Sequence, residues 1–456
     1  MNSIELLPSE ENLITALNKN ILNRNKDLVY FYDLLLAQET SGTIAIDGRW
    51  GSGKTFFVKQ SNLVINALNP ASEMDEEKRM EILSNLPFKK TDEEHENFDL
   101  AIYYDAWKND NDTDPVMSIV YEITKQLNLT YTFEDKDLCK LAGAIVETIS
   151  GRNVNGIIEQ LKSADSLAKF KEQKELEEKI SSFFGEILIE RGNRLIVFID
   201  ELDRCKPSFA VKLLEQIKHY LSDDRVTFVF SVNLDELQHT IRHYYGESFD
   251  ACRYLDRFFN LRIELPPAKI EKFYEMLGLN TSYTIDKMIK RICKMYNFQL
   301  REITRFCQQV KAAVYSPTHG GGNYDFSFSE GRTRHFLLMY MVPLVIGLRI
   351  VDISLYDDFV NGKNDKPLKD LFAFEDMIEY VLYRMLNRDE SFEQVEGKTL
   401  ISYDEKIESL YRAIFATDYT GNKYHEVLGE CEFDASSKSF LLSAASMMSH
   451  YADYTI

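Results

Sequence analysis

Apolar residues along this chain follow two different spacings. Five short runs are expected to be strands, and the first four hold consecutive apolar residues, which is typical of strands buried on both faces of a sheet. These runs are residues 43–47, 98–104, 195–199, 226–231 and about 261–265. Between them, apolar residues recur every three or four positions, as on one face of a helix. Strands that alternate with helices predict a three-layer α/β fold, in which helices cover both faces of a parallel sheet.

The segments that flank this pattern are predicted to be helical. Within residues 1–40, Leu28, Phe31 and Leu35 keep helical spacing, and the chain after Ile270 is almost wholly helical in pattern. Three consecutive glycines at 320–322 indicate a boundary. We therefore expect an N-terminal helical segment (1–40), a sheet domain (41–268) with a helical insertion at about 110–190, a helical segment (269–316) and a helical C-terminal domain (317–456).

The longest uncharged apolar run extends from Phe336 to Leu348 and contains Pro343. A helix that spans a membrane needs about 20 apolar residues. This run is shorter, so we expect a buried core helix and no membrane span.

Composition and charge narrow the function classes. The formal net charge is −20, which does not support direct nucleic-acid binding, because phosphate backbones attract positive surfaces. The six cysteines include no C-x-x-C pair, so a zinc site is not expected. Scattered cysteines and a polar N-terminus without a signal-peptide core favour a cytoplasmic protein with reduced thiols.

One loop carries the most specific motif of the chain, Gly48-Arg49-Trp50-Gly51-Ser52-Gly53-Lys54-Thr55. It reads G-x-x-x-x-G-K-T between a predicted strand and a predicted helix, which is the setting of a phosphate-binding P-loop. Glycines let successive backbone amides point at phosphate oxygens. Lys54 can reach the β- and γ-phosphates, and Thr55 can place its hydroxyl on Mg²⁺. We expect nucleotide contacts from Gly48, Trp50, Gly51, Ser52, Gly53, Lys54 and Thr55.

Two acidic residues, Asp200 and Glu201, follow the buried run at 195–199. The carboxyl end of a strand is where ligands bind in open α/β sheets. Asp200 is expected to hold Mg²⁺ through water, and Glu201 to orient or deprotonate an attacking water. Together with Lys54, these acids predict hydrolysis of a nucleoside triphosphate.

Further polar residues are candidates for catalysis. Asn233, which follows the fourth run, could touch the γ-phosphate or the attacking water, or could simply initiate a turn. Arg257 precedes the fifth run and could act as an arginine finger on the nucleotide of a neighbouring copy. Arg253 and Arg262 are rivals for that role, and the alternative for each is a surface ion pair.

Two more sets of residues have open assignments. Arg301 and Arg305 stand one helical turn apart and could reach over the nucleotide or lie on a solvated helix face. Trp107, one of two tryptophans with Trp50, is expected to pack in the core.

Three segments together resemble the KAP family of P-loop NTPases. They are the loop with Trp50 inside it, the strand end Tyr104–Trp107, and the run from Ile199 to Pro207 with its Asp-Arg-Cys-x-Pro tail. The resemblance covers about residues 20–315. It implies an additional-strand ATPase core of the AAA+ and STAND type, with ATP and Mg²⁺ as cofactors, sheet order 5-1-4-3-2, and residues 269–316 as a helical lid.

Family members often carry membrane helices between the P-loop and the acidic strand, and bacterial members include phage-exclusion proteins. Here the 144 residues between Thr55 and Asp200 contain no spanning run. The resemblance therefore implies an ATPase without the membrane insertion, and a role in anti-phage defence.

We expect an ATPase that acts as a molecular switch or remodeller. The alternative is a nucleotide-bound scaffold or sensor with little turnover that gates a partner effector. A small-molecule kinase is disfavoured because nothing marks an acceptor pocket, and no N-K-x-D or L-S-G-G-Q motif points to a GTPase or an ABC ATPase. We also expect a homo-oligomer or transient self-association, and a protein partner bound by residues 317–456.

Overall fold

The computed structural model describes residues 7–38, 42–88, 98–127, 182–185, 187–188, 191–220, 224–279, 284–314, 331–373, 403–415, 425–428 and 431–446. The chain forms two compact units, one that ends at Ile270 and one that begins at Glu271. The predicted boundaries at 40, 268 and 316 stay predictions. Most of the predicted insertion and the three glycines at 320–322 lie outside the described residues.

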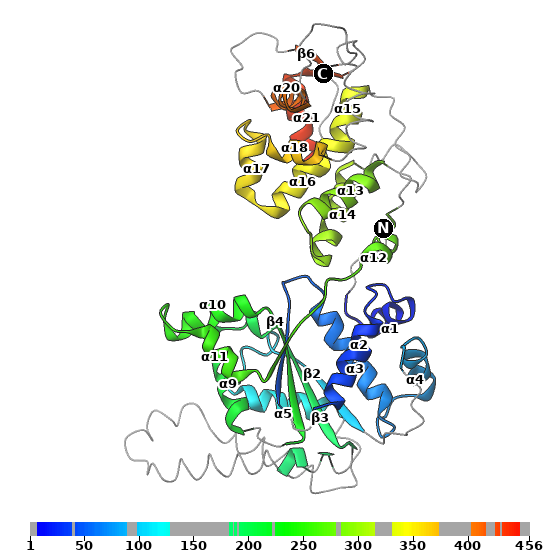
Figure 1. Ribbon diagram of the computed structural model, residues 1–456, viewed down its shortest axis with the longest axis vertical. Coiled ribbons are helices and arrows are strands. Elements are labelled where there is room, and N and C mark those ends of the chain that lie inside the picture. Colours follow the sequence, from blue (N-terminus) through cyan, green and yellow to red (C-terminus); the bar gives the residue numbers. More distant parts are fainter. Residues whose placement is uncertain are drawn as a thin grey trace. The chain divides into compact units, whose positions relative to one another are not determined.

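The first unit contains a five-stranded sheet in which every neighbouring pair of strands is parallel. Its strand order, β2-β3-β4-β1-β5, confirms the predicted order 5-1-4-3-2. Asp105 at the end of β2 is level with Asp200 at the end of β3, so the carboxyl ends form one edge (Figure 1). The strands are β1 (Thr43–Asp47), β2 (Asp99–Asp105), β3 (Arg194–Asp200), β4 (Val226–Val232) and β5 (Leu261–Glu264).

Helices cover both faces of this sheet, as Figure 1 shows. One face packs against α1 (Glu10–Lys19), α2 (Asn25–Leu36), α3 (Lys54–Leu68) and α4 (Glu76–Leu83). The other face packs against α5 (Pro115–Gln126), α9 (Pro207–Tyr220), α10 (Leu234–Tyr245) and α11 (Ala251–Phe258). Alternate residues of β3 enter the two cores, Phe198 on the first side and Val197 on the second, because successive strand side chains point to opposite faces.

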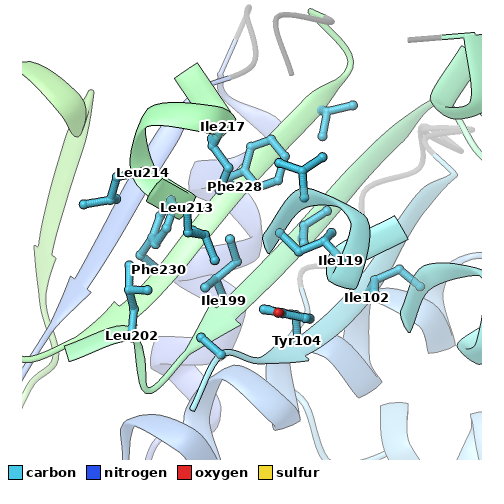
Figure 2. Packing of buried hydrophobic residues seen from close by; sticks show 14 of the residues in the cluster. Ile102, Tyr104, Ile119, Ile199, Leu202, Leu213, Leu214, Ile217, Phe228 and Phe230 are labelled. Atoms are coloured by element: carbon cyan, nitrogen blue, oxygen red, sulfur yellow. The ribbon is translucent and has the colours of Figure 1, made fainter. Parts of the chain in front are cut away.

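The core on the α9 side is dense and aromatic. Phe228 and Phe230 of β4 lie beneath Leu213 and Ile217 of α9 (Figure 2). All seven residues of β4 are buried. Each fully buried large apolar side chain stabilises the fold by about 1.5–3 kcal/mol, so the strands form a rigid platform for the residues at their carboxyl ends.

The second unit is mainly helical, as expected for a helical segment and C-terminal domain. A two-stranded antiparallel hairpin is an addition that the helical pattern did not predict. It joins β6 (His425–Leu428) to β7 (Cys431–Asp434). The helices are α12 (Glu271–Met276), α13 (Thr284–Met295), α14 (Leu300–Val314), α15 (Arg332–Phe336), α16 (Val342–Val351), α17 (Ile353–Val360), α18 (Lys366–Phe372), α20 (Tyr403–Phe415) and α21 (Ala435–Ala445).

The predicted apolar core helix lies within a continuous helix, Arg332–Val351. Among the described residues it is the one helix long and apolar enough to cross a membrane, but 67% of its apolar window is buried inside the protein. Its middle turn, η2 (Leu337–Met341), is a π-helix in which the Val342 amide donates to the Leu337 carbonyl. Pro343 follows directly, and a proline ring disturbs the preceding helical turn.

Candidate active site

The glycine-rich loop between β1 and α3 is shaped by backbone that only glycine adopts easily. Gly51 and Gly53 have φ of 81° and 90°, which is the left-handed region. A Cβ on Gly48 would lie 2.9 Å from Ser52 Oγ. That hydroxyl is buried and has no partner within the described part of the chain. A tight curl around an unsatisfied buried hydroxyl fits the phosphates of a nucleotide.

Lys54 is the first residue of α3 and is 9% exposed. Its Nζ donates to the Gly48 carbonyl and, at 3.2 Å, to the Arg49 carbonyl, so the ammonium lies across the loop. Burial lowers the pKa of Lys54, and nearby carboxylates oppose this shift. These carboxylates belong to Asp203, Asp200, Glu201 and Asp47.

Asp200 ends β3 and is 1% exposed. Its carboxylate accepts hydrogen bonds from the Tyr103 hydroxyl at 2.9 Å and from the Glu201 amide at 3.0 Å. Burial raises the pKa of Asp200, and the bond from Tyr103 works against that shift. Tyr103 lies on the neighbouring strand β2 and was not among the predicted site residues, because nothing local in sequence marks it as a partner of Asp200.

Glu201 leaves β3 in the left-handed conformation, with φ 61° and ψ 24°, which is unusual for a residue other than glycine. Its Oε1 accepts a hydrogen bond from the Thr55 hydroxyl at 3.3 Å. Its Oε2 forms an ion pair with Nε of Arg204, which closes the 3₁₀ turn η1 (Leu202–Arg204). The structure therefore brings the two predicted motifs into direct contact.

Both tryptophans lie beside Arg204. The guanidinium carbon is 5.7 Å from the Trp50 ring centre and 5.4 Å from that of Trp107. Trp50 Nε1 also donates to Asp203 Oδ2 at 2.6 Å. Trp107 is 53% exposed, so the prediction that it packs in the core is wrong. A cation can hold an indole at the surface, and a strand-end pattern does not reveal such a partner.

Asn233 caps the first turn of α10, where its side chain accepts from the Asp235 amide at 3.2 Å. It follows Val232, which is level with Asp47 at the end of β1. Asn233 therefore lies at the same sheet edge as the glycine-rich loop, and its contact with phosphate or water stays a prediction.

Arg257 is exposed on α11 and lies at the other edge of the sheet. The next residue, Phe258, accepts a hydrogen bond from the hydroxyl of Thr43, where β1 begins. The structure therefore does not bring Arg257 together with the loop of its own chain. Arg253 and Arg257 line a depression of about 410 Å³ beside α9, whereas Arg262 is ion-paired with Asp256 at 2.7 Å.

Arg301 and Arg305 are exposed on α14 of the second unit. Their spacing places them on one helix face, as predicted. Contact of either residue with a nucleotide stays a prediction.

Arg24 is a site residue that sequence reasoning missed. It is 3% exposed and its guanidinium donates to the carbonyls of Ser52 at 3.1 Å, Gly53 at 3.5 Å and Pro266 at 2.7 Å. Burial lowers the pKa of Arg24 to about 10, and Asp27 opposes the shift. Arg24 thus fixes the back of the glycine-rich loop to the segment after β5, although the sequence around it contains no motif.

Comparison with known proteins agrees with this geometry. Residues 12–314 match the model of the KAP family P-loop domain, which is more than half of the chain. A comparison with curated proteins finds no match. The matched region contains the loop, both acids, Arg257 and α14. Since the family match spans the sheet and its site, the chain belongs to the KAP family of P-loop NTPases and is a nucleotide-binding protein.

Proposed function

We propose that this chain binds ATP with Mg²⁺ and hydrolyses it, and that it acts as a molecular switch or remodeller. The observation that carries the proposal is the contact between Thr55 Oγ1 and Glu201 Oε1, beside the buried carboxylate of Asp200. The closeness of these three side chains supports the proposal, because a hydroxyl and an acid that hold a metal ion and a base that acts on water must lie together.

Each side chain has a distinct role in this proposal. Lys54 and the loop amides bind the β- and γ-phosphates, while Thr55 and Asp200 hold the metal ion. Bound Mg²⁺ neutralises charge on the phosphoryl group that is transferred. Glu201 orients a water molecule and accepts its proton. Asn233 is suited to hold the same water or the γ-phosphate from the end of β4.

The activity test is ATP turnover by the purified chain across a range of Mg²⁺ concentrations. Lys54→Ala should abolish ATP binding, because the loop loses its cation. Glu201→Gln should still bind Mg-ATP but hydrolyse it roughly 10²–10⁴-fold more slowly. Asp200→Asn should need more Mg²⁺. Unchanged ATP affinity in Lys54→Ala would contradict the site, and parental turnover in Glu201→Gln would assign the base role to another residue.

The second candidate function is a nucleotide-bound scaffold or sensor that turns over slowly and gates a partner effector. The ion pair between Glu201 and Arg204 favours it, because an engaged carboxylate is less available to water. In both readings we propose that residues 317–456 bind the protein partner and that the pathway is anti-phage defence. Turnover that stays far below the roughly 1–10³ per second typical of enzymes with Glu201 intact, while ATP binds tightly, would support the scaffold over the ATPase.

A further inference from the structure

The side chain of Arg204 makes three contacts that come from three separate segments of the chain. Its Nε pairs with Glu201 Oε2. Its guanidinium carbon lies over Trp50 of the glycine-rich loop and over Trp107 after β2. Arg204 thus links the loop, the end of β2 and the acidic end of β3 through one group.

The carboxylate of Glu201 has both oxygens engaged. Oε1 accepts from Thr55 and Oε2 from Arg204. Both partners of the ion pair are only partly accessible to solvent, so water screens the pair less than it screens a surface pair. A carboxylate oxygen that already accepts from a guanidinium is less available to a water molecule. Glu201 is therefore engaged with Arg204 and is not free to act as a general base.

The glycine-rich loop contributes one of the two rings that contact Arg204. Trp50 presents its ring to Arg204 and is itself tied to the buried Asp203 by a hydrogen bond of 2.6 Å. A cation–π contact contributes roughly 0.5–2 kcal/mol, depending on how far it is desolvated. Any rearrangement of the loop that shifts Trp50 weakens the hold on Arg204.

We infer that Arg204 is a positioning residue that restrains Glu201, and that Trp50 and Trp107 make this restraint depend on the conformation of the phosphate loop. The inference rests on the proposed hydrolysis. Its consequence is a chain whose basal turnover is held low by one ion pair, and which accelerates when the loop and its tryptophan move.

The test compares steady-state ATP turnover in Arg204→Met and the parent. Methionine keeps the length of the side chain but removes the charge, so kcat should rise roughly tenfold, which corresponds to about 1.4 kcal/mol, with KM for Mg-ATP unchanged. Trp107→Phe should raise kcat less, because it weakens only one of the two ring contacts of Arg204. Arg412→Met, which breaks a helical ion pair with Glu408, is the matched control and should leave turnover at the parental rate.

A double-mutant cycle separates this inference from the proposed function. If Arg204 acts through Glu201, Arg204→Met should have no effect on turnover in the Glu201→Gln background. A fall or no change in kcat for Arg204→Met, or an equal effect in both backgrounds, would overturn the restraint. Parental turnover in Glu201→Gln alone would instead refute the base assignment. If Arg204→Met does not fold, Arg204→Gln, which also removes the charge, and Trp107→Phe decide, and parental kcat in both overturns the inference.

Discussion

At the scale of single residues, the hydrogen bond from Tyr103 to Asp200 offers a clean test of the metal-binding end of the site. Tyr103→Phe removes the donor and leaves a buried carboxylate with one bond fewer. A hydrogen bond to a charged group contributes about 1.5–3 kcal/mol, so we expect a lower Tm and a higher Mg²⁺ concentration for half-maximal turnover.

Tyr104→Phe is the matched control for this change. Tyr104 is on the same strand and donates to Ser118 Oγ at 2.9 Å. Losing that neutral hydrogen bond should cost about 0.5–1.5 kcal/mol of folding free energy and leave the Mg²⁺ dependence unchanged. If the Mg²⁺ concentration for half-maximal turnover rose equally in both variants, Tyr103 would not act through Asp200.

Burial of Asp200 also predicts how stability depends on pH. The pKa of Asp200 is raised in the folded chain, so the folded state holds this proton more tightly than the unfolded state does. Ionisation of Asp200 therefore lowers the free energy of unfolding as the pH rises through the folded pKa. This loss is absent below the pKa of the unfolded chain, about 3.9. Thermal unfolding in a metal chelator should show Asp200→Asn above the parent in Tm at pH 8, with a difference that shrinks as the pH falls towards the unfolded pKa of about 3.9. A variant less stable than the parent at pH 8 would refute this.

Residue identity alone predicted the loop, Lys54, Thr55, Asp200 and Glu201, since each stands in a local motif with its own chemistry. It did not predict Tyr103, Arg24 or the position of Arg204 between two rings. These residues act through partners that are distant in sequence, and only the packing of the strands brings them together.

At the scale of elements, the helix pair α1 and α2 is joined to the site by Arg24. Arg24→Met would leave the carbonyls of Ser52 and Pro266 without this donor, at a cost of about 1–3 kcal/mol. Since the loop would also lose its support, we expect weaker nucleotide binding, measured by titration, together with a lower Tm.

Arg79→Met separates the two effects. Arg79 likewise donates to backbone carbonyls, those of Ala67 at 2.6 Å and Asn69 at 2.8 Å, at the far end of α3. Arg79→Met should lower Tm by an amount similar to that for Arg24→Met, without a change in nucleotide affinity. Equal affinity losses in the two variants would mean that Arg24 contributes only to general stability.

The elements themselves were largely predictable. Apolar runs marked β1 to β4, because strands buried on both faces show little alternation. β5 alternates instead, and the family resemblance supplied the order of the strands. The hairpin at β6 and β7 was not predicted, since strands this short carry little pattern and the family resemblance, which covers β5, ends at about residue 315.

At the scale of the whole molecule, the location of Arg257 predicts self-association. It lies at the sheet edge where β1 begins, so any role on a nucleotide requires the nucleotide of another copy. Arg257→Ala should lower turnover by ~10³-fold while ATP binding persists. Mixing this variant with Lys54→Ala should restore part of the activity, because each retains the half-site that the other lacks.

Two results would exclude a finger in trans. One is a mixture that stays inactive, and the other is a parent that is active as a monomer at every concentration. Arg257 would then be an exposed arginine of the depression beside α9. Each copy carries a formal net charge of −20, so two copies repel one another. Salt screens this repulsion, so self-association should strengthen as the salt concentration rises.

The stack around Arg204 has an optical consequence. The chain contains only two tryptophans, and both lie against this one guanidinium. Indole emission from the whole protein therefore originates at a single point, beside the phosphate loop and the acidic strand end. Because both indoles share this environment, the fluorescence spectrum of this chain reports on one place, the candidate active site.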